Sequence, residues 1–161
     1  MKVTRTAVLV KPDGLQRGLI GEIISRFERK GLKLVGLKMV RLDNDQLDQW
    51  YVEHKDKSFF ADLKSFMGSM PIVAMAWEGI DAVPVVRRLV GTTLGREAEG
   101  GSIRGDFGMS QQMNLIHASS SHEDAEREIS IVFPKSELFE YHGVTEAVVY
   151  AEGEAEFESI A

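Results

Sequence analysis

Hydrophobic and polar positions along the chain follow two different periods, and each period predicts a different kind of element. Short apolar runs rich in β-branched residues predict strands over residues 6–10, 32–42, 71–77 and 130–133. Apolar residues three and four positions apart predict helices over residues 19–30, 46–53, 58–66, 82–90 and 123–129. This order predicts an α+β, ferredoxin-like fold with an antiparallel four-stranded sheet covered by helices.

One long segment follows neither period. Residues 91–113 hold six glycines and no regular apolar spacing, so they are expected to form a long crossover loop. A loop of this length in a small domain is uncommon and is often functional. A helix is expected to begin soon after it, because Ser120 with Glu123, or Ser121 with Asp124, has the spacing of a capping box.

The length of 161 residues, with 43% hydrophobic and 27% charged residues, is typical of one globular domain. We expect a single domain over residues 1–150 and an acidic, flexible tail over residues 151–161. The net charge is −6, and the tail holds four glutamates without a basic residue, so the rest of the chain is nearly neutral. This balance argues against nucleic-acid binding through a basic surface.

Other functional classes are excluded by what the sequence lacks. No apolar run approaches the roughly 20 residues that span a bilayer, and the first residues do not resemble a secretory signal. The chain has no cysteine, which excludes a disulfide scaffold and thiolate chemistry and fits a cytoplasmic location. The sequence holds neither a P-loop nor an H-E-x-x-H motif, so we expect no metal site built by the protein itself.

Several polar residues are not explained by the folding pattern and are candidates for chemistry. Each also has a simpler interpretation: a charged residue can merely end a strand or face the solvent, and a lone histidine is more often structural. These candidates are Lys11, Tyr51, Arg87, Thr93, Arg104, Asn114, His117 and Glu128.

The surroundings of His117 favour the catalytic interpretation. It follows an apolar pair and precedes small residues, which leaves its ring unshielded just before a predicted helix. An imidazole with a pKa of ~6.5 is largely neutral at pH 7 and can act as a nucleophile. Glu128, on the second turn of the following helix, is a candidate acceptor to orient the ring. Nearby basic residues and a threonine would suit a phosphoryl group, and we expect Arg87 and Arg104 to lie exposed in the cleft.

Several motifs together resemble the nucleoside diphosphate kinase family, in continuous register from about residue 5 to residue 133. They are Val10-Lys11-Pro12-Asp13-Gly14, Gln16-Arg17-Gly18-Leu19-Ile20-Gly21, Lys30-Gly31, Trp77-Glu78-Gly79, Ile103-Arg104-Gly105-Asp106-Phe107 and Asn114-Leu115-Ile116-His117-Ala118-Ser119. The resemblance implies transfer of the γ-phosphate of a nucleoside triphosphate to a nucleoside diphosphate. The implied mechanism is ping-pong, through a phosphohistidine, with broad base specificity and Mg²⁺ on the nucleotide phosphates.

The resemblance also implies roles for individual residues. His117 resembles the phosphorylated nucleophile, with Glu128 and Ser119 as the pair that fixes its ring. The positions implied to bind nucleotide are Lys11 and Asn114 at the ribose, Lys11 and Tyr51 beside the phosphates, Arg87, Thr93 and Arg104 on the phosphates, and Phe59 and Leu63 at the base. Implied partners are nucleoside tri- and diphosphates (ATP, GTP, ADP, GDP and deoxy forms) and further copies of the chain, as a hexamer or alternatively a tetramer.

Departures from the family pattern leave a second interpretation open. Ala118 replaces a common glycine and would be strained if that position required positive φ, and Ser120 replaces a common aspartate. The crossover loop lacks its usual prolines, which makes the hexamer less secure. A nucleotide-sensing or assembly module that has lost activity is therefore the alternative to an enzyme, and turnover would distinguish the two. We expect His54 to be solvated and uninvolved.

Overall fold

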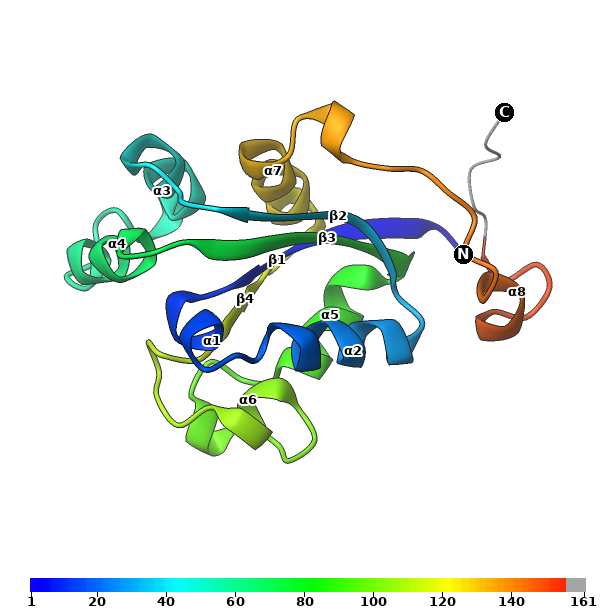
Figure 1. Ribbon diagram of the computed structural model, residues 1–161, viewed down its shortest axis with the longest axis horizontal. Coiled ribbons are helices and arrows are strands. Elements are labelled where there is room, and N and C mark those ends of the chain that lie inside the picture. The colour runs from blue at the N-terminus through cyan, green and yellow to red at the C-terminus, as the bar shows by residue number, and fades with distance from the viewer. Residues whose placement is uncertain (156–161) are drawn as a thin grey trace.

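The computed structural model describes residues 1–155 as a four-stranded antiparallel sheet with helices on both faces (Figure 1). The strand order is β2-β3-β1-β4, with β1 spanning Val3–Val10, β2 Lys33–Val40, β3 Ile72–Ile80 and β4 Ile116–Ala118. All three strand pairs are antiparallel. The predicted fold class is confirmed.

Each face of the sheet carries its own apolar core, because successive side chains of a strand point to opposite faces. Val8 and Val10 of β1 pack in one cluster with helices α2 and α5, while Ala7 and Leu9 pack in the other with α3, α4 and α7. Figure 1 shows α2 and α5 on one side of the sheet, and α3 and α7 on the other. The central strands β1 and β3 are therefore buried on both faces, as their continuous apolar runs predict.

The helices lie close to the predicted ranges, with short additional turns between them. Their bounds are α1 Pro12–Gln16, α2 Ile20–Lys30, α3 Asn44–Trp50, η1 Val52–His54, α4 Phe60–Gly68, α5 Ala82–Val90, η2 Gly95–Glu97, α6 Ile103–Phe107, α7 His122–Val132, η3 Lys135–Glu137 and α8 Glu146–Val149. The crossover loop over residues 91–113 thus contains η2 and α6. Within residues 1–155, no helix combines the length and apolar character needed to cross a bilayer.

The predicted strand over residues 130–133 is wrong, because these residues end helix α7. Ser121 caps that helix by accepting a hydrogen bond from the Asp124 N–H at 3.0 Å. The buried positions Ala125, Glu128, Ile129 and Val132 are three and four residues apart, which is helical spacing. The fourth strand is instead β4, which has only three residues and is too short to show a period in the sequence.

After α7 the chain turns back and covers the start of β2 at the end of the sheet away from β4 (Figure 1). We call residues 138–150 the C-terminal arm. The Phe139 N–H donates to the Val35 carbonyl at 2.8 Å, and the Tyr141 hydroxyl donates to the Leu34 carbonyl at 2.8 Å. The Tyr150 hydroxyl accepts from the Ile80 N–H at 3.3 Å. Residues 151–155 continue from the arm, and the rest of the predicted tail lies outside the described residues.

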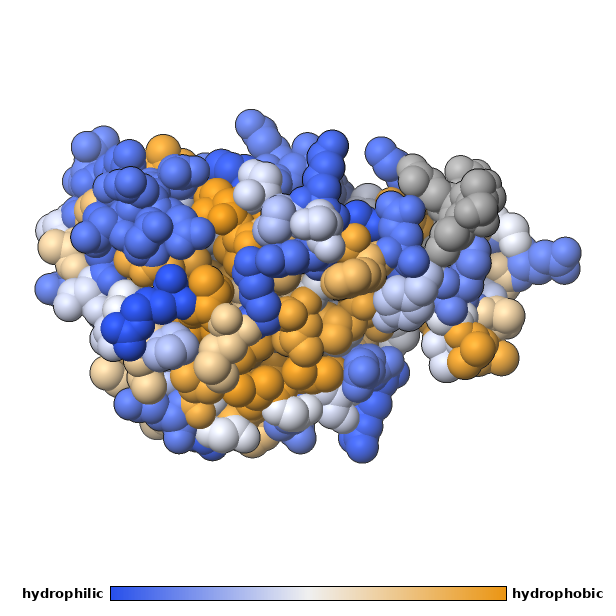
Figure 2. Space-filling model, turned by 45° about the horizontal axis from the view of Figure 1, so that its top comes forward, coloured by the Kyte–Doolittle hydropathy of each residue, from blue (hydrophilic) through white to orange (hydrophobic). Residues whose placement is uncertain are grey.

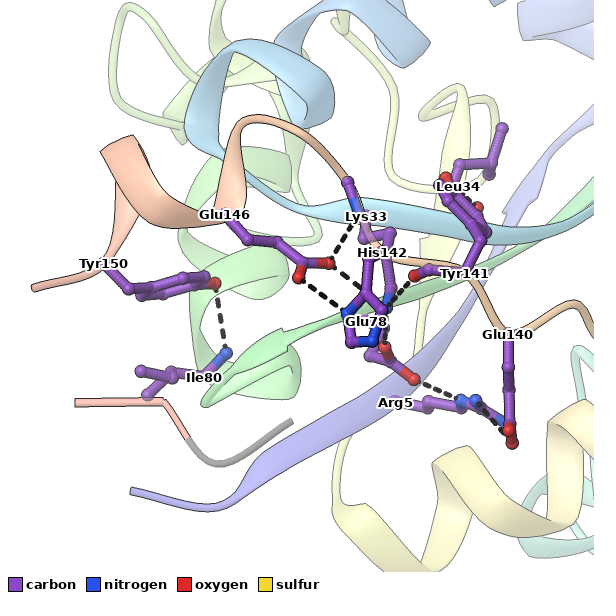
Figure 3. Close-up of polar contacts among 11 residues, drawn as sticks. Arg5, Lys33, Leu34, Glu78, Ile80, Glu140, Tyr141, His142, Glu146 and Tyr150 are labelled. Carbon is purple, nitrogen blue, oxygen red and sulfur yellow. Dashed lines mark hydrogen bonds and ion pairs between the residues drawn. The ribbon is translucent and has the colours of Figure 1, made fainter. Parts of the chain in front are cut away.

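Glu78 on β3 joins the arm to the sheet through two cations (Figure 3). One carboxylate oxygen accepts from Arg5 at 2.7 Å and the other pairs with Lys33 at 2.7 Å. Lys33 in turn lies 3.4 Å from Glu146 of the arm and donates to the Tyr141 carbonyl at 2.9 Å. Because the side chains of Glu78 and Lys33 are only 12% and 13% exposed, water screens this pair weakly.

We expect Glu78→Ala to lower the free energy of unfolding by about 2 kcal/mol, because it leaves two partly buried cations without their shared carboxylate. Denaturant titration followed by circular dichroism measures this change. Glu140→Ala is the matched control. Glu140 is 59% exposed and lies 3.7 Å from Arg5, so its removal should change stability by less than about 0.5 kcal/mol. Equal effects of the two substitutions would contradict the central position of Glu78.

Candidate active site

A cleft of about 740 Å³ opens at the end of the sheet opposite the C-terminal arm. Residues of α3, η1 and α4 form one wall, the crossover loop forms the other, and β4 and α7 lie between them. This volume is in the range of small-molecule binding sites. Nearly all of the predicted site residues line it: Lys11, Tyr51, Phe59, Leu63, Arg87, Thr93, Arg104, Asn114, His117 and Glu128.

His117 lies in the middle of β4 with one ring nitrogen bound by the protein. Its Nε2 lies 2.9 Å from Oε1 of Glu128, whose side chain is almost fully buried. The other carboxylate oxygen of Glu128 accepts from the Ser119 hydroxyl at 2.7 Å. That hydroxyl also accepts from the Ala7 N–H on β1 at 3.1 Å, which ties the group to the sheet. Ser119 does not line the cleft but holds the carboxylate that orients the ring.

This hydrogen bond fixes which nitrogen of His117 is chemically available. A carboxylate only accepts, so in the neutral ring Nε2 carries the proton and Nδ1 keeps its lone pair. Within the described part of the chain, Nδ1 has no hydrogen-bond partner. The ring lines the cleft and is 22% exposed. The arrangement therefore presents an oriented, unprotonated nitrogen to whatever the cleft binds.

Aromatic side chains hold the ring from the α3 side. The Trp50 ring meets the His117 ring edge-on, with centroids 5.3 Å apart, and Tyr51 does so at 6.4 Å. Burial, together with the nearby Glu128 carboxylate, raises the pKa of the Tyr51 hydroxyl, so it stays protonated. Trp50 was missed in the sequence, because an apolar residue at the end of an amphipathic helix has the same pattern whether it packs on core or on a catalytic ring.

Lys11, which is buried, and Arg104, which is partly buried, place two cations in the same cleft as the histidine. The Lys11 Nζ donates to Asn114 Oδ1 at 2.8 Å and to the Gln112 carbonyl at 3.1 Å. Burial, and then repulsion from Arg104, lowers the pKa of Lys11 to about 8. Burial, and then repulsion from Arg87, lowers the pKa of Arg104 to about 10. The lowered pKa values show that holding these cations close together costs electrostatic free energy. A bound polyanion would offset that cost, so the cleft is suited to one.

Arg87 and Arg104 differ in exposure, which corrects the expectation that both lie exposed. Arg87, at the end of α5, is exposed at the cleft. Arg104 is partly buried and donates to three backbone carbonyls, those of Asn114 at 3.2 Å, Gly91 at 3.0 Å and Ile116 at 2.6 Å. Arg104 therefore holds the loop against β4 as well as supplying charge.

The mouth of the cleft carries the aromatic residues expected at a base. Phe59 is 48% exposed at the rim, whereas its neighbour Phe60 packs against the core. The prediction that His54 is solvated is wrong. His54 is only partly exposed and lines the cleft. Its ring stacks on Tyr51 with centroids 6.1 Å apart and lies tilted against Phe59 at 5.6 Å. Opposite them, Gln112 donates from Nε2 to the Asp62 carbonyl at 3.4 Å, which joins the two walls.

The two departures beside His117 are accommodated. Ala118 lies in β4 opposite Val8 and does not have positive φ, so a side chain there is not strained. The positive φ occurs earlier, at Leu115 (φ 75°). Ser120 donates to Asp124, and this hydrogen bond lowers the pKa of the Asp124 carboxyl. The nucleophile's surroundings therefore do not depend on the family's glycine or aspartate at these positions.

Residues 1–155 contain no group of three or more histidine and acidic side chains that could hold a metal ion. The cleft instead offers cations, hydroxyl groups and amides, which suit the phosphates and sugar of a nucleotide. A divalent cation would enter such a site as part of a nucleotide complex and be ligated by phosphate oxygens.

Comparison with known proteins agrees with this geometry. The family model described as nucleoside diphosphate kinase matches residues 4–138. The nucleoside diphosphate kinase of Staphylothermus marinus is 53% identical over 141 residues, which cover 88% of this chain and 100% of the relative. That of Saccharolobus solfataricus is 54% identical over 138 residues, covering 86% of this chain and 100% of the relative.

Solved structures give the same result. A halophilic nucleoside diphosphate kinase from Halobacterium salinarum, in complex with CDP, superposes with a TM-score of 0.87 at 50% identity, covering 91% of this chain and 97% of that one. A nucleoside diphosphate kinase family protein from Babesia bovis superposes with a TM-score of 0.89 at 48% identity, covering 91% of this chain and 99% of that one. On the sequence match, the fold and the cleft together, the chain belongs to the nucleoside diphosphate kinase family.

Proposed function

We propose that the protein transfers the γ-phosphate of a nucleoside triphosphate to a nucleoside diphosphate through a phosphohistidine at His117. The observation that carries this proposal is the 2.9 Å contact between His117 Nε2 and Glu128, which leaves Nδ1 unprotonated in a cleft lined by cations. In the first half-reaction Nδ1 attacks the γ-phosphorus, the bond from phosphorus to the β-γ bridging oxygen breaks, and the diphosphate leaves. In the second, an oxygen of the acceptor's terminal phosphate attacks the phosphohistidine and Nδ1 leaves.

Two parts of the site lower the barrier by electrostatic means. The phosphorylated ring carries positive charge, which the Glu128 carboxylate stabilises through the Nε2 proton. Charge on the equatorial oxygens of the transferring group is stabilised by Lys11, Arg87 and Arg104. The Tyr51 hydroxyl, which is buried without a partner among the described residues, is an available donor beside the histidine.

The remaining cleft residues bind the rest of the nucleotide in this proposal. Asn114 Oδ1 accepts from Lys11, so the two side chains together present polar groups to the ribose. Thr93 offers its hydroxyl to a phosphate, and its carbonyl accepts from Asn114 at 2.8 Å. Phe59 stacks on the base with Leu63 beside it, and stacking supports broad base specificity, because every base has a π-face.

Further expectations follow from the same assignment. The substrates are Mg²⁺ complexes of ribo- and deoxyribonucleotides, including ATP, GTP, ADP and GDP, in the cytoplasm. Self-association is supported by the surface: Figure 2 shows apolar residues gathered across the middle of one face, with hydrophilic ones around them. The edge strand β2 exposes Leu37 and Met39 at 49% and 62%. A hexamer, or alternatively a tetramer, is the assembly we expect.

The alternative of an inactive nucleotide-sensing module is disfavoured by the intact arrangement around His117. Such a module would bind nucleotide without needing an unprotonated nitrogen held against a buried carboxylate. Tight nucleotide binding without transfer to a diphosphate acceptor would favour this alternative.

We expect wild-type protein incubated with γ-labelled ATP to become labelled in an acid-labile, alkali-stable form. His117→Asn should abolish both the label and the transfer, because no other ring nitrogen occupies this position. His142→Asn is the control, since His142 lies in the C-terminal arm and pairs with Glu146. Autoradiography of the protein and a coupled assay measure the two quantities. Label that persists in His117→Asn would remove His117 as the nucleophile.

We expect kcat/KM to fall as pH rises through about 8, because the depressed pKa of Lys11 means that its phosphate-binding charge is lost there. A bound phosphate stabilises the charged form and raises this pKa, so the alkaline limb of kcat should lie at higher pH than that of kcat/KM. Initial rates between pH 6.5 and about 10 measure both profiles. A kcat/KM that stays constant to about pH 9.5 would contradict a role for this cation.

Substitutions of Arg87 and Arg104 should differ in their effect on stability, although both should lower kcat/KM. Arg87→Ala should lower kcat/KM by about 10²-fold with an unchanged melting temperature, because the side chain is exposed at the cleft. Arg104→Ala should lower kcat/KM and also destabilise the fold by about 2 kcal/mol, because three partly buried backbone carbonyls lose their donor. Thermal melting and steady-state kinetics of both variants test this contrast. An unchanged stability of Arg104→Ala would contradict its structural role.

A further inference from the structure

Leu115 has a backbone conformation that a leucine rarely adopts. Its φ is 75°, and among residues 1–155 the only other non-glycine residue with positive φ is Asp81. A bulky side chain in this region is strained and persists only where surrounding contacts hold it. Leu115 is fully buried and lies immediately before β4, two residues before His117. Whatever holds Leu115 therefore also sets how the nucleophile enters the cleft.

The turn after β1 supplies these contacts from Lys11, Asp13 and Gly14. The Lys11 N–H donates to the Leu115 carbonyl at 2.8 Å, and the Leu115 N–H donates to Oδ2 of Asp13 at 2.9 Å. Gly14 lies directly against this carbonyl, since a Cβ there would come within 2.7 Å of the oxygen. Asp13, in α1, thus contributes the one side-chain hydrogen bond that the Leu115 backbone makes within residues 1–155.

The position of Asp13 is unfavourable for a site that binds phosphates. It adds a negative charge close to Lys11 and Arg104, and its Oδ1 is buried without a hydrogen-bond partner in the described part of the chain. The side chain is not among those lining the cleft, so it does not reach a bound nucleotide directly. A partly unsatisfied carboxylate near the phosphate site is unfavourable, so its presence calls for another explanation. Its hydrogen bond to the Leu115 N–H provides one.

We propose that Asp13 is a positioning residue of the transfer reaction, which holds Leu115 in its left-handed conformation and thereby keeps His117 against Glu128 with Nδ1 in the cleft. The proposal rests on the proposed role of His117 as the nucleophile. What matters at Asp13 is an acceptor oxygen at the Leu115 N–H. Its charge is a separate contribution, which favours the protonated forms of Lys11 and Arg104.

These two contributions are separated by a pair of substitutions. Asp13→Ala removes the acceptor, and we expect kcat to fall about 10²-fold with little change in KM, because a misplaced nucleophile slows the step more than it weakens binding. Asp13→Asn keeps an oxygen at the Leu115 N–H and should retain kcat within a few-fold. The alkaline limb of its kcat/KM profile should lie at lower pH than in the wild type. Without the carboxylate, Lys11 faces Arg104 and the polar groups of Asn114 and Gln112 alone, so its pKa falls further.

A second-site substitution distinguishes positioning from a loss of folding. In the Asp13→Ala background, Leu115→Gly should restore much of kcat, because glycine adopts positive φ without strain. Asp81→Ala is the matched control: it changes the other strained residue, far from the cleft, and should leave kcat unchanged. All variants are assayed below their melting temperatures, measured by circular dichroism, so that lost activity is not lost fold.

Single-turnover labelling with γ-labelled ATP gives the deciding measurement. If wild-type protein is labelled and Asp13→Ala is labelled at the same rate, the positioning role is overturned while the phosphohistidine stands. If Asp13→Asn falls as far as Asp13→Ala, the hydrogen-bond acceptor is not what matters and the proposal also fails. If Leu115→Gly proves unfolded, the contrast between Asp13→Ala and Asp13→Asn decides. If the wild type is never labelled, the proposed function itself fails.

Discussion

The contact between Glu128 and His117 is the interaction on which the rest of the site depends. Glu128 is almost fully buried, and a buried carboxylate is tolerated only where hydrogen bonds satisfy it. One oxygen accepts from the Ser119 hydroxyl and the other faces His117 Nε2. Both the helix and the strand must therefore be in place before the ring is oriented. The Ser121 cap begins α7 only a few residues after β4 and so fixes where Glu128 lies.

The cations of the cleft carry an electrostatic cost that the fold offsets by other means. Lys11 is buried and Arg104 is partly buried, and burial lowers the pKa of both. Repulsion from Arg104 lowers the pKa of Lys11 further, and repulsion from Arg87 lowers that of Arg104. Lys11 donates to the Gln112 carbonyl and to Asn114, which ties the end of the crossover loop to the end of β1. Arg104 donates to the Ile116 carbonyl, which ties the same loop to β4. An arriving polyphosphate relieves the repulsion between the cations. The same interactions thus order the loop and prepare it for an anion.

Sequence patterns revealed those parts of the fold whose period is long enough to read. The strands around residues 6–10 and 71–77 and the helix over 82–90 were predicted because they are long and buried. The strand β4 was missed because three residues show no period, and residues 130–133 were misread because β-branched residues also pack on one face of α7. The gathering of the site residues into one cleft followed from the family motifs. The left-handed Leu115 could not be predicted, since leucine has no preference for that conformation.

Strand β1 shows how stability and chemistry are kept apart in this fold. At its beginning, Arg5 pairs with Glu78 and belongs to the network that anchors the C-terminal arm. At its end, Lys11 enters the cleft and its backbone supports Leu115. The residues between are buried on both faces and hold the strand rigid. The ion pairs of the arm lie at the far end of the sheet, where no substrate touches them. The stability they add to the fold offsets the strain at Leu115 and the repulsion between the cations of the cleft.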